Sequence, residues 1–92
     1  MIKVRFFTLL KLYLGINELI IEAKVVKMKE LIFLAREKTE KDFVHKLLNK
    51  DGTLKKGTII LINGKNILHL DGLESIINSG DDVDFFPPGG GG

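Results

Sequence analysis

The sequence contains no cysteine among its 92 residues, and this absence excludes several functions. Without cysteine the chain has no disulfide, no thiolate nucleophile, no sulfur ligand for a metal and no persulfide of its own. The absence suits a reducing compartment, and we expect a cytoplasmic protein. Aromatic residues are also scarce, at 8% against 45% for all hydrophobic residues, which predicts an aliphatic core of isoleucine, leucine and valine.

Long hydrophobic runs and a strong net charge are lacking as well. No apolar stretch approaches the roughly 20 residues that a membrane-spanning helix needs. The N-terminal segment is apolar enough to suggest a signal peptide, but Lys3, Arg5 and Lys11 interrupt it and no small-residue cleavage site follows. The formal net charge is only +2 and the lysines are spread along the chain, whereas nucleic-acid binding usually needs a basic patch or stripe. We therefore expect neither a membrane nor a nucleic acid as a partner.

The first half of the chain predicts a strand pair followed by a helix. Hydrophobic and charged residues alternate in IKVRFF (2–7), which is typical of a half-buried strand. TLLKLYLG (8–15) leads to a turn at Gly15, and NELIIEA (17–23) is a second strand, so we expect an antiparallel hairpin. From Val25 onward apolar residues recur at three- and four-residue spacings, which predicts an amphipathic helix of about three to four turns.

The second half predicts a short helix and another hairpin. DFVHKLLNKDG (42–52) has helical spacing, with Asp42 as its cap and the DG dipeptide at its end. In TIILINGKNI (58–67) a β-branched run meets Asn63 and Gly64, a dipeptide suited to a turn with positive φ, and a short return strand follows.

The final segments complete an α+β pattern. DGLESIINSGDD (71–82) is a compact connection with about one helical turn, and DVDFF (82–86) is the last strand. Pro87 and Pro88 end this strand because proline cannot donate a hydrogen bond to a β ladder. A hairpin, a helix and then more strands predict one mixed sheet with one main helix packed on one face.

The residues after the last strand, PPGGGG (87–92), form the only low-complexity segment. We therefore expect one folded domain (1–86) and a flexible tail (87–92). A frayed terminus or an added linker is one interpretation of the tail. A phosphate-binding glycine loop is excluded, because such loops precede the N-terminus of a helix and no helix follows here.

The third interpretation makes the terminal carboxylate the functional group. The two prolines would direct the tail away from the sheet, and glycines would give a thread without side chains that reaches at most about 17–18 Å beyond Pro87. Such a thread can enter another protein's active site while the domain stays outside. A carboxylate is a poor acyl donor until it is activated, so a partner enzyme would supply the chemistry.

Three parts of the sequence resemble a known family: MIKVRFF (1–7), INGKNILHLDGLESIINSGDDVDFFPP (62–88) and the closing Gly91–Gly92. They resemble the MoaD/ThiS family of ubiquitin-like sulfur carriers, and the ending resembles its MoaD branch, the small subunit of molybdopterin synthase. The resemblance implies a ubiquitin-like β-grasp fold. Family members usually carry side chains where this chain has Gly89 and Gly90, so the spacing is kept but side-chain contacts there are lost.

The resemblance also implies a mechanism and partners. An E1-like activating enzyme of the MoeB/ThiF type would use ATP to adenylate the carboxylate of Gly92, which Gly91 precedes in the tail. Sulfur from a persulfide donor would displace AMP and leave a thiocarboxylate, which would serve a MoaE-like large subunit in building molybdopterin. The chain itself would bind no cofactor or metal and would not be catalytic alone. Two alternatives stay open: a protein modifier joined to lysines through Gly92, and a sulfur carrier for thiazole synthesis.

Strand alternation predicts which residues dock on a partner. Val83 and Phe85 share the core face of the last strand, so Phe86 faces outward and is an expected aromatic anchor beside the tail. Phe7 faces outward by the same alternation. The predicted partner-binding residues are therefore Phe7, Phe86, Pro87, Pro88, Gly89 and Gly90. Leu61 or Ile62 contributes as well, and alternation alone leaves open which of the two.

The remaining polar residues predict no catalytic or metal site. Asp81, Asp82 and Asp84 form an acidic cluster, which we expect to be solvated or to steer the tail toward a basic partner surface. Three near neighbours on a turn and a strand are poorly arranged as metal ligands. His45 and His69 are far apart in the sequence, and we interpret both as surface or turn residues.

Overall fold

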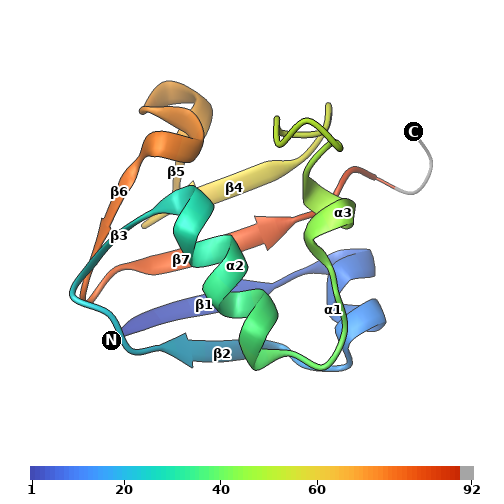
Figure 1. Ribbon diagram of the computed structural model, residues 1–92, viewed down its shortest axis with the longest axis horizontal. Coiled ribbons are helices and arrows are strands. Elements are labelled where there is room, and N and C mark those ends of the chain that lie inside the picture. Colours follow the sequence, from blue (N-terminus) through green and yellow to red (C-terminus); the bar gives the residue numbers. More distant parts are fainter. Residues whose placement is uncertain (90–92) are drawn as a thin grey trace.

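The computed structural model describes residues 1–89, which contain a five-stranded mixed sheet in the order β2-β1-β7-β4-β5 (Figure 1). Its strands are β1 (Ile2–Phe6), β2 (Glu18–Ile21), β4 (Ile59–Ile62), β5 (Lys65–Asn66) and β7 (Asp82–Phe86). The central pair, β1 and β7, is parallel, and the other pairs are antiparallel. The predicted N-terminal hairpin and the mixed sheet are confirmed.

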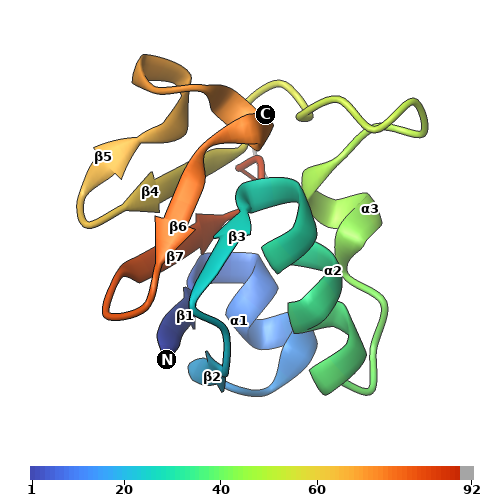
Figure 2. The same cartoon turned by 60° about the vertical axis from the view of Figure 1, so that its left-hand side comes forward.

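The main helix, α2 (Met28–Lys38), crosses one face of this sheet (Figures 1 and 2). Its buried residues, Met28, Leu31, Ile32 and Ala35, follow the spacing that the sequence shows. The helix begins at Met28, and the prediction that it begins at Val25 was wrong. The preceding residues instead form β3 (Val25–Lys27), which pairs antiparallel with β6 (Ile76–Asn78) in a separate two-stranded sheet.

A second helix, α1 (Thr8–Leu14), was not predicted. Only the turn at Gly15 was expected there, and Gly15 does adopt a left-handed conformation with φ 74° at the end of the helix. The helix has seven residues and buries only Leu10 fully, so its sequence shows too little periodicity to separate it from a loop. Leu9 and Leu12 on the same helix are exposed.

The third helix, α3 (Val44–Leu47), is shorter than predicted. The N-cap residue is Phe43 and not Asp42 as predicted, although the Asp42 side chain accepts a hydrogen bond of 3.0 Å from the Val44 N–H at the start of the helix. This bond is the main cause that lowers the pKa of the Asp42 carboxyl, and Arg36 adds to the effect. The helix ends early because Leu48 forms a β-bridge to Leu54. The connection after β5 contains two 3₁₀ helices, η1 (Ile67–His69) and η2 (Gly72–Glu74).

The core lies between the sheet and the helices, and it is mainly aliphatic, as predicted. Three phenylalanines, one half of the six in the chain, nevertheless meet at its centre. The ring of Phe6 lies 5.5 Å from that of Phe43 and 6.0 Å from that of Phe85, with ring centroids as the reference points. Phe85 therefore joins the last strand to an aromatic cluster that also includes the loop before α3. No helix among residues 1–89 has the length and apolar character needed to cross a membrane.

The turn between β4 and β5 supports a test of backbone strain. Asn63 and Gly64 have φ angles of 50° and 85°, the left-handed pair that the sequence predicted. We expect Gly64→Ala to lower the free energy of unfolding by about 1–2 kcal/mol, because a Cβ is disfavoured in this conformation. Urea denaturation measures the loss. Gly89→Ala is the matched control, since Gly89 lies outside the left-handed region with no atom within 4 Å of an added Cβ. Equal stabilities of the two variants would contradict the prediction.

Candidate functional site

The tail leaves the domain from the centre of the sheet. β7 lies between β1 and β4, and both neighbours pair with it along its length. The Phe7 N–H still donates to the Phe85 carbonyl oxygen over 3.1 Å. After Phe86 the ladder ends, which confirms the predicted role of Pro87 and Pro88 in ending the strand. In Figure 1 the tail leaves at the end of the sheet where α1 and α3 lie, opposite the N-terminus.

The two prolines remain packed against the domain. Pro87 is buried and Pro88 is half-buried, whereas Gly89 is exposed. Gly57, with φ 92°, lies against Pro88 so closely that a Cβ on it would be 3.5 Å from the Pro88 Cβ. The tail base is therefore held from the side by the loop before β4. The predicted site residues Gly90, Gly91 and Gly92 lie outside the described residues, and their roles stay predictions.

The two outward phenylalanines stack on each other. The rings of Phe7 and Phe86 have centroids 4.5 Å apart and an interplanar angle of 9°. Both side chains are half-buried, so Phe86 is less exposed than its outward position on the strand suggested. The reason is the parallel register of β1 and β7. It pairs Phe6 with Phe85, and the residues that follow them, Phe7 and Phe86, therefore lie side by side. The stack fixes both rings beside the tail base.

Two aliphatic residues of β4 extend this surface. Ile59 is paired with Phe86 in the sheet and is 43% exposed. Leu61 is half-buried on the outward side, whereas Ile62 is buried, so the alternative between Leu61 and Ile62 is resolved in favour of Leu61. Sequence reasoning missed Ile59, although the alternation along β4 places it on the same side as Leu61. We call Phe7, Phe86, Ile59 and Leu61 the outer-face patch.

The acidic cluster was expected to be solvated or to steer the tail, and for Asp84 the first expectation was wrong. Asp84 is only 8% exposed, and it accepts hydrogen bonds from Arg5 Nε over 2.6 Å and Nη2 over 3.2 Å. The bond and the charge of Asp84 raise the pKa of the Arg5 guanidinium. Asp81 accepts hydrogen bonds from the Asn63 Nδ2 and the Asn78 N–H. Asp81 and Asp82 lie at the start of β7, the opposite end of this strand from the tail, and Asp84 lies at its middle.

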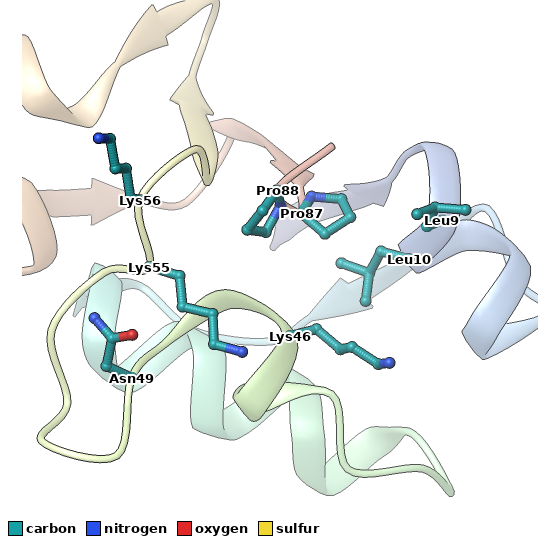
Figure 3. Close-up of a pocket in the computed structure, with 8 residues that line it drawn as sticks. All are labelled: Leu9, Leu10, Lys46, Asn49, Lys55, Lys56, Pro87 and Pro88. Atoms are coloured by element: carbon teal, nitrogen blue, oxygen red, sulfur yellow. The ribbon is translucent and has the colours of Figure 1, made fainter. Parts of the chain in front are cut away.

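A groove lies beside the tail base on the side of α1 and α3 (Figure 3). It has a volume of about 490 Å³, and its walls come from separate parts of the chain. The lining residues are Leu9, Leu10, Lys46, Asn49, Lys55, Lys56, Pro87 and Pro88. We call it the lysine groove. Sequence reasoning missed it, because its lysines come from α3 and from the loop before β4 and only the fold brings them to the prolines.

Both histidines lie at the surface, as expected. His45 and His69 are exposed, and the ring of His45 meets that of Tyr13 edge to face at 6.3 Å. Within residues 1–89, no three side chains of the metal-binding types come together in a potential metal site.

The sequence of the chain matches the model of the ThiS family over residues 4–92. The chain belongs to the ThiS family. Among proteins similar to this ThiS family member is one from Archaeoglobus fulgidus described as a sulfur carrier, 37% identical over 76 residues, or 83% of this chain and 85% of the relative. Small archaeal modifier protein 3 from Haloferax volcanii is 42% identical over 45 residues, which is 49% of each chain.

Solved structures confirm the fold of this ThiS family protein. A chain of the BexX/CysO complex from Amycolatopsis orientalis superposes with a TM-score of 0.83 at 18% identity, and 100% of each chain is covered. Urm1 from Trypanosoma brucei superposes with a TM-score of 0.79 at 24% identity, covering 99% of this chain and 94% of Urm1. Structural similarity at a sequence identity this low establishes the fold alone. The predicted ubiquitin-like β-grasp fold is confirmed.

Proposed function

We propose that this ThiS family protein is a sulfur carrier whose Gly92 carboxylate is converted to a thiocarboxylate. Family membership and the similarity to the sulfur carrier of Archaeoglobus fulgidus support the proposal. The observation that carries it is the tail base: Pro87 and Pro88 pack at the end of the central strand, and only glycines follow. Such a base gives the tail a defined starting point, and the glycines let it pass through a narrow entrance.

The proposed chemistry proceeds on the tail inside partner enzymes. An activating enzyme transfers the AMP of ATP to the Gly92 carboxylate and releases pyrophosphate. The outer sulfur of a donor's persulfide attacks the acyl carbon, and AMP leaves with the electron pair of the broken C–O bond. A second thiol then cleaves the S–S bond of the acyl disulfide, which leaves the thiocarboxylate and a new disulfide. The chain has no cysteine, so neither the persulfide nor the second thiol belongs to it.

We propose molybdopterin synthesis as the destination of the sulfur, with the chain as the small subunit on a MoaE-like large subunit. The sequence FFPP before the glycines supports this destination, because it is typical of the MoaD branch. In the fold, this motif joins the outer-face patch directly to the tail base. One docking event would therefore hold the domain and align the tail.

A protein modifier is the second candidate, and the similarity to small archaeal modifier protein 3 favours it. The two functions share every step up to the acyl adenylate. They differ in the nucleophile that follows, which is a persulfide sulfur for the carrier and a lysine amine for the modifier.

Intact mass spectrometry of the protein purified from its own host tests the proposal. We expect a species heavier by the replacement of one oxygen with sulfur, with the change localised to the C-terminal peptide. A ladder of higher-mass species on a denaturing gel, without the sulfur-containing species, would support the modifier instead. If the purified chain stays unmodified with the host's activating enzyme, ATP and a persulfide donor, both candidates are wrong.

The outer-face patch supports a prediction about docking. We expect Phe86→Ala to weaken binding to the large subunit by on the order of 2 kcal/mol, because the variant removes one ring of the aromatic stack and exposes the other. Isothermal titration calorimetry measures the change. Phe33→Ala is the matched control, since Phe33 is 51% exposed on α2, which covers the other face of the sheet. If both variants bind as the wild type does, Phe86 is not part of the interface.

A further inference from the structure

The lysine groove and the tail share two residues. Pro87 and Pro88 line the groove, and they are also the last packed residues before the glycines. A protein that encloses the tail up to its base must therefore cover the groove as well. Its contact surface would extend from the tail over the exposed Leu9 of α1.

The charge of the groove is positive, and no carboxylate side chain of residues 1–89 forms an ion pair with it. Lys46, Lys55 and Lys56 line it, and its lining contains no acidic residue. Four basic residues elsewhere are paired: Arg5 with Asp84, Lys27 and Lys29 with Glu74, and Arg36 with Asp42. None of the ion pairs within residues 1–89 involves a lysine of the groove. Lys46 and Lys55 thus have no carboxylate partner among the described residues, and their ammonium groups supply the positive charge inside the groove (Figure 3).

The backbone that carries the lysines is fixed by hydrogen bonds. The Lys55 N–H donates to the Leu47 carbonyl oxygen over 2.9 Å, and the buried Thr58 Oγ1 donates to the same oxygen over 3.1 Å. Lys46 Nζ lies 4.6 Å from the centroid of the Tyr13 ring, which restricts that side chain. Figure 3 shows the Lys55 side chain extended between Asn49 and Lys46. The Lys56 side chain starts from the same loop but points away from the other lining residues (Figure 3). A partner would therefore meet a backbone that is already in place, on which the lysine ends can adjust.

The apolar part of the lining helps to decide whether the groove suits a phosphate group or an acidic peptide. Leu9 is 50% exposed, and together with Leu10, Pro87 and Pro88 it gives the groove an apolar side. A phosphate site typically offers converging backbone N–H groups at a helix N-terminus. Here the cationic groups are flexible side-chain ends, and α3 has only four residues. Acidic and apolar residues close together on one peptide match both parts of the lining.

We propose that the lysine groove is the docking site for an acidic peptide segment of the protein that receives the tail. This inference rests on the proposed function in one respect, namely that a protein encloses the tail. It reverses the electrostatic expectation from the sequence, in which the aspartates near β7 steered the tail toward a basic surface. Asp81 and Asp82 lie at the far end of the strand and Asp84 is paired with Arg5, whereas the charge beside the tail has the opposite sign.

Titration of the ¹⁵N-labelled full chain with a synthetic peptide of alternating glutamate and leucine tests the proposal. We expect saturable NMR shifts at the amides of Lys46, Asn49, Lys55 and Lys56, and weaker binding at higher salt. The charge-reversed pair Lys55→Glu/Lys56→Glu is expected to weaken binding at least about tenfold. The matched pair Lys24→Glu/Lys65→Glu changes the net charge equally at exposed positions outside the groove, and we expect it to bind within about twofold of the wild type.

Four results would overturn the proposal. The first is that the acidic peptide causes no saturable shift, and the second is that both variant pairs weaken its binding equally. The third is that a peptide with lysine in place of glutamate binds equally well. The fourth is that pyrophosphate binds at the same amides more tightly than the acidic peptide does. Removal of residues 90–92 is expected to leave the affinity unchanged, and a marked rise would assign the groove to the chain's own tail. Thiocarboxylate formation by the wild type is measured separately. If the wild type is converted but the peptide does not bind, the docking inference alone fails, and if it is never converted, the proposed function fails.

Discussion

Deletion of Gly92 is expected to abolish thiocarboxylate formation while changing the free energy of unfolding by less than about 0.5 kcal/mol. The shortened chain still ends in a carboxylate, but that group lies about 3.3–3.6 Å closer to Pro88 along the extended tail. A displacement of even about 1 Å at a reacting group can reduce the rate about 100-fold. Stability is unaffected because the core is built from residues up to Phe85, well before the deletion.

The composition of the tail makes this variant a test of length alone. Residues 89–92 are all glycine, so deleting any one of them gives the same protein. A variant with one added glycine is the matched control for length in the other direction. A semisynthetic chain with Gly92 as an amide keeps the length and removes the carboxylate, and we expect it to be inactive too. Wild-type rates of adenylation for the shortened or the amidated chain, or a large fall in melting temperature, would contradict the prediction.

Phe85→Ala is expected to lower the free energy of unfolding by about 3–5 kcal/mol, the usual cost of removing a buried aromatic ring. Phe85 is fully buried, and its ring centroid lies 6.0 Å from that of Phe6 and 6.2 Å from that of Phe43. Because domains are stable by only about 5–15 kcal/mol, this loss is a large part of the total. Guanidinium denaturation monitored by circular dichroism measures it.

The adjacent residue supplies the control for this experiment. Phe86→Ala removes the same side chain one position later, on the opposite face of the strand, where only the stack with Phe7 is lost. We expect a smaller cost of about 0.5–1.5 kcal/mol. The two neighbouring substitutions should therefore separate stability from docking. A greater loss of stability for Phe86→Ala than for Phe85→Ala would contradict the placement of the two rings.

Local sequence patterns were sufficient to predict the strands, the turn and the helix that depend mainly on neighbouring residues. Alternation predicted β1 and β7, the Asn63–Gly64 dipeptide predicted the turn, and helical spacing predicted α2. The pair β3 and β6 was missed because each strand has three residues and its partner lies far away in the sequence. Short strands of this kind show no periodicity of their own, and only the tertiary fold pairs them.

The sequence predicted which way the side chains of the candidate site point, but not which residues they contact. Alternation placed Phe86 on the correct face, but its half-buried state depends on Phe7 from the other end of the chain. Asp84 looked solvated because its partner, Arg5, lies 79 positions away. The lysine groove has the same origin, since its walls come from three separate segments. The chemistry assigned to the tail came from the resemblance to a family, and no pattern of spacing would have supplied it.

The position of β7 at the centre of the sheet has a mechanical consequence. A protein-unfolding motor that seizes the glycines pulls on a strand held by ladders on both sides, from β1 and from β4. Extraction must break both ladders and withdraw Val83 and Phe85 from the core, whereas an edge strand such as β2 or β5 would peel from one neighbour only. The domain therefore resists unravelling from the end by which the proposed partner enzymes would grip it.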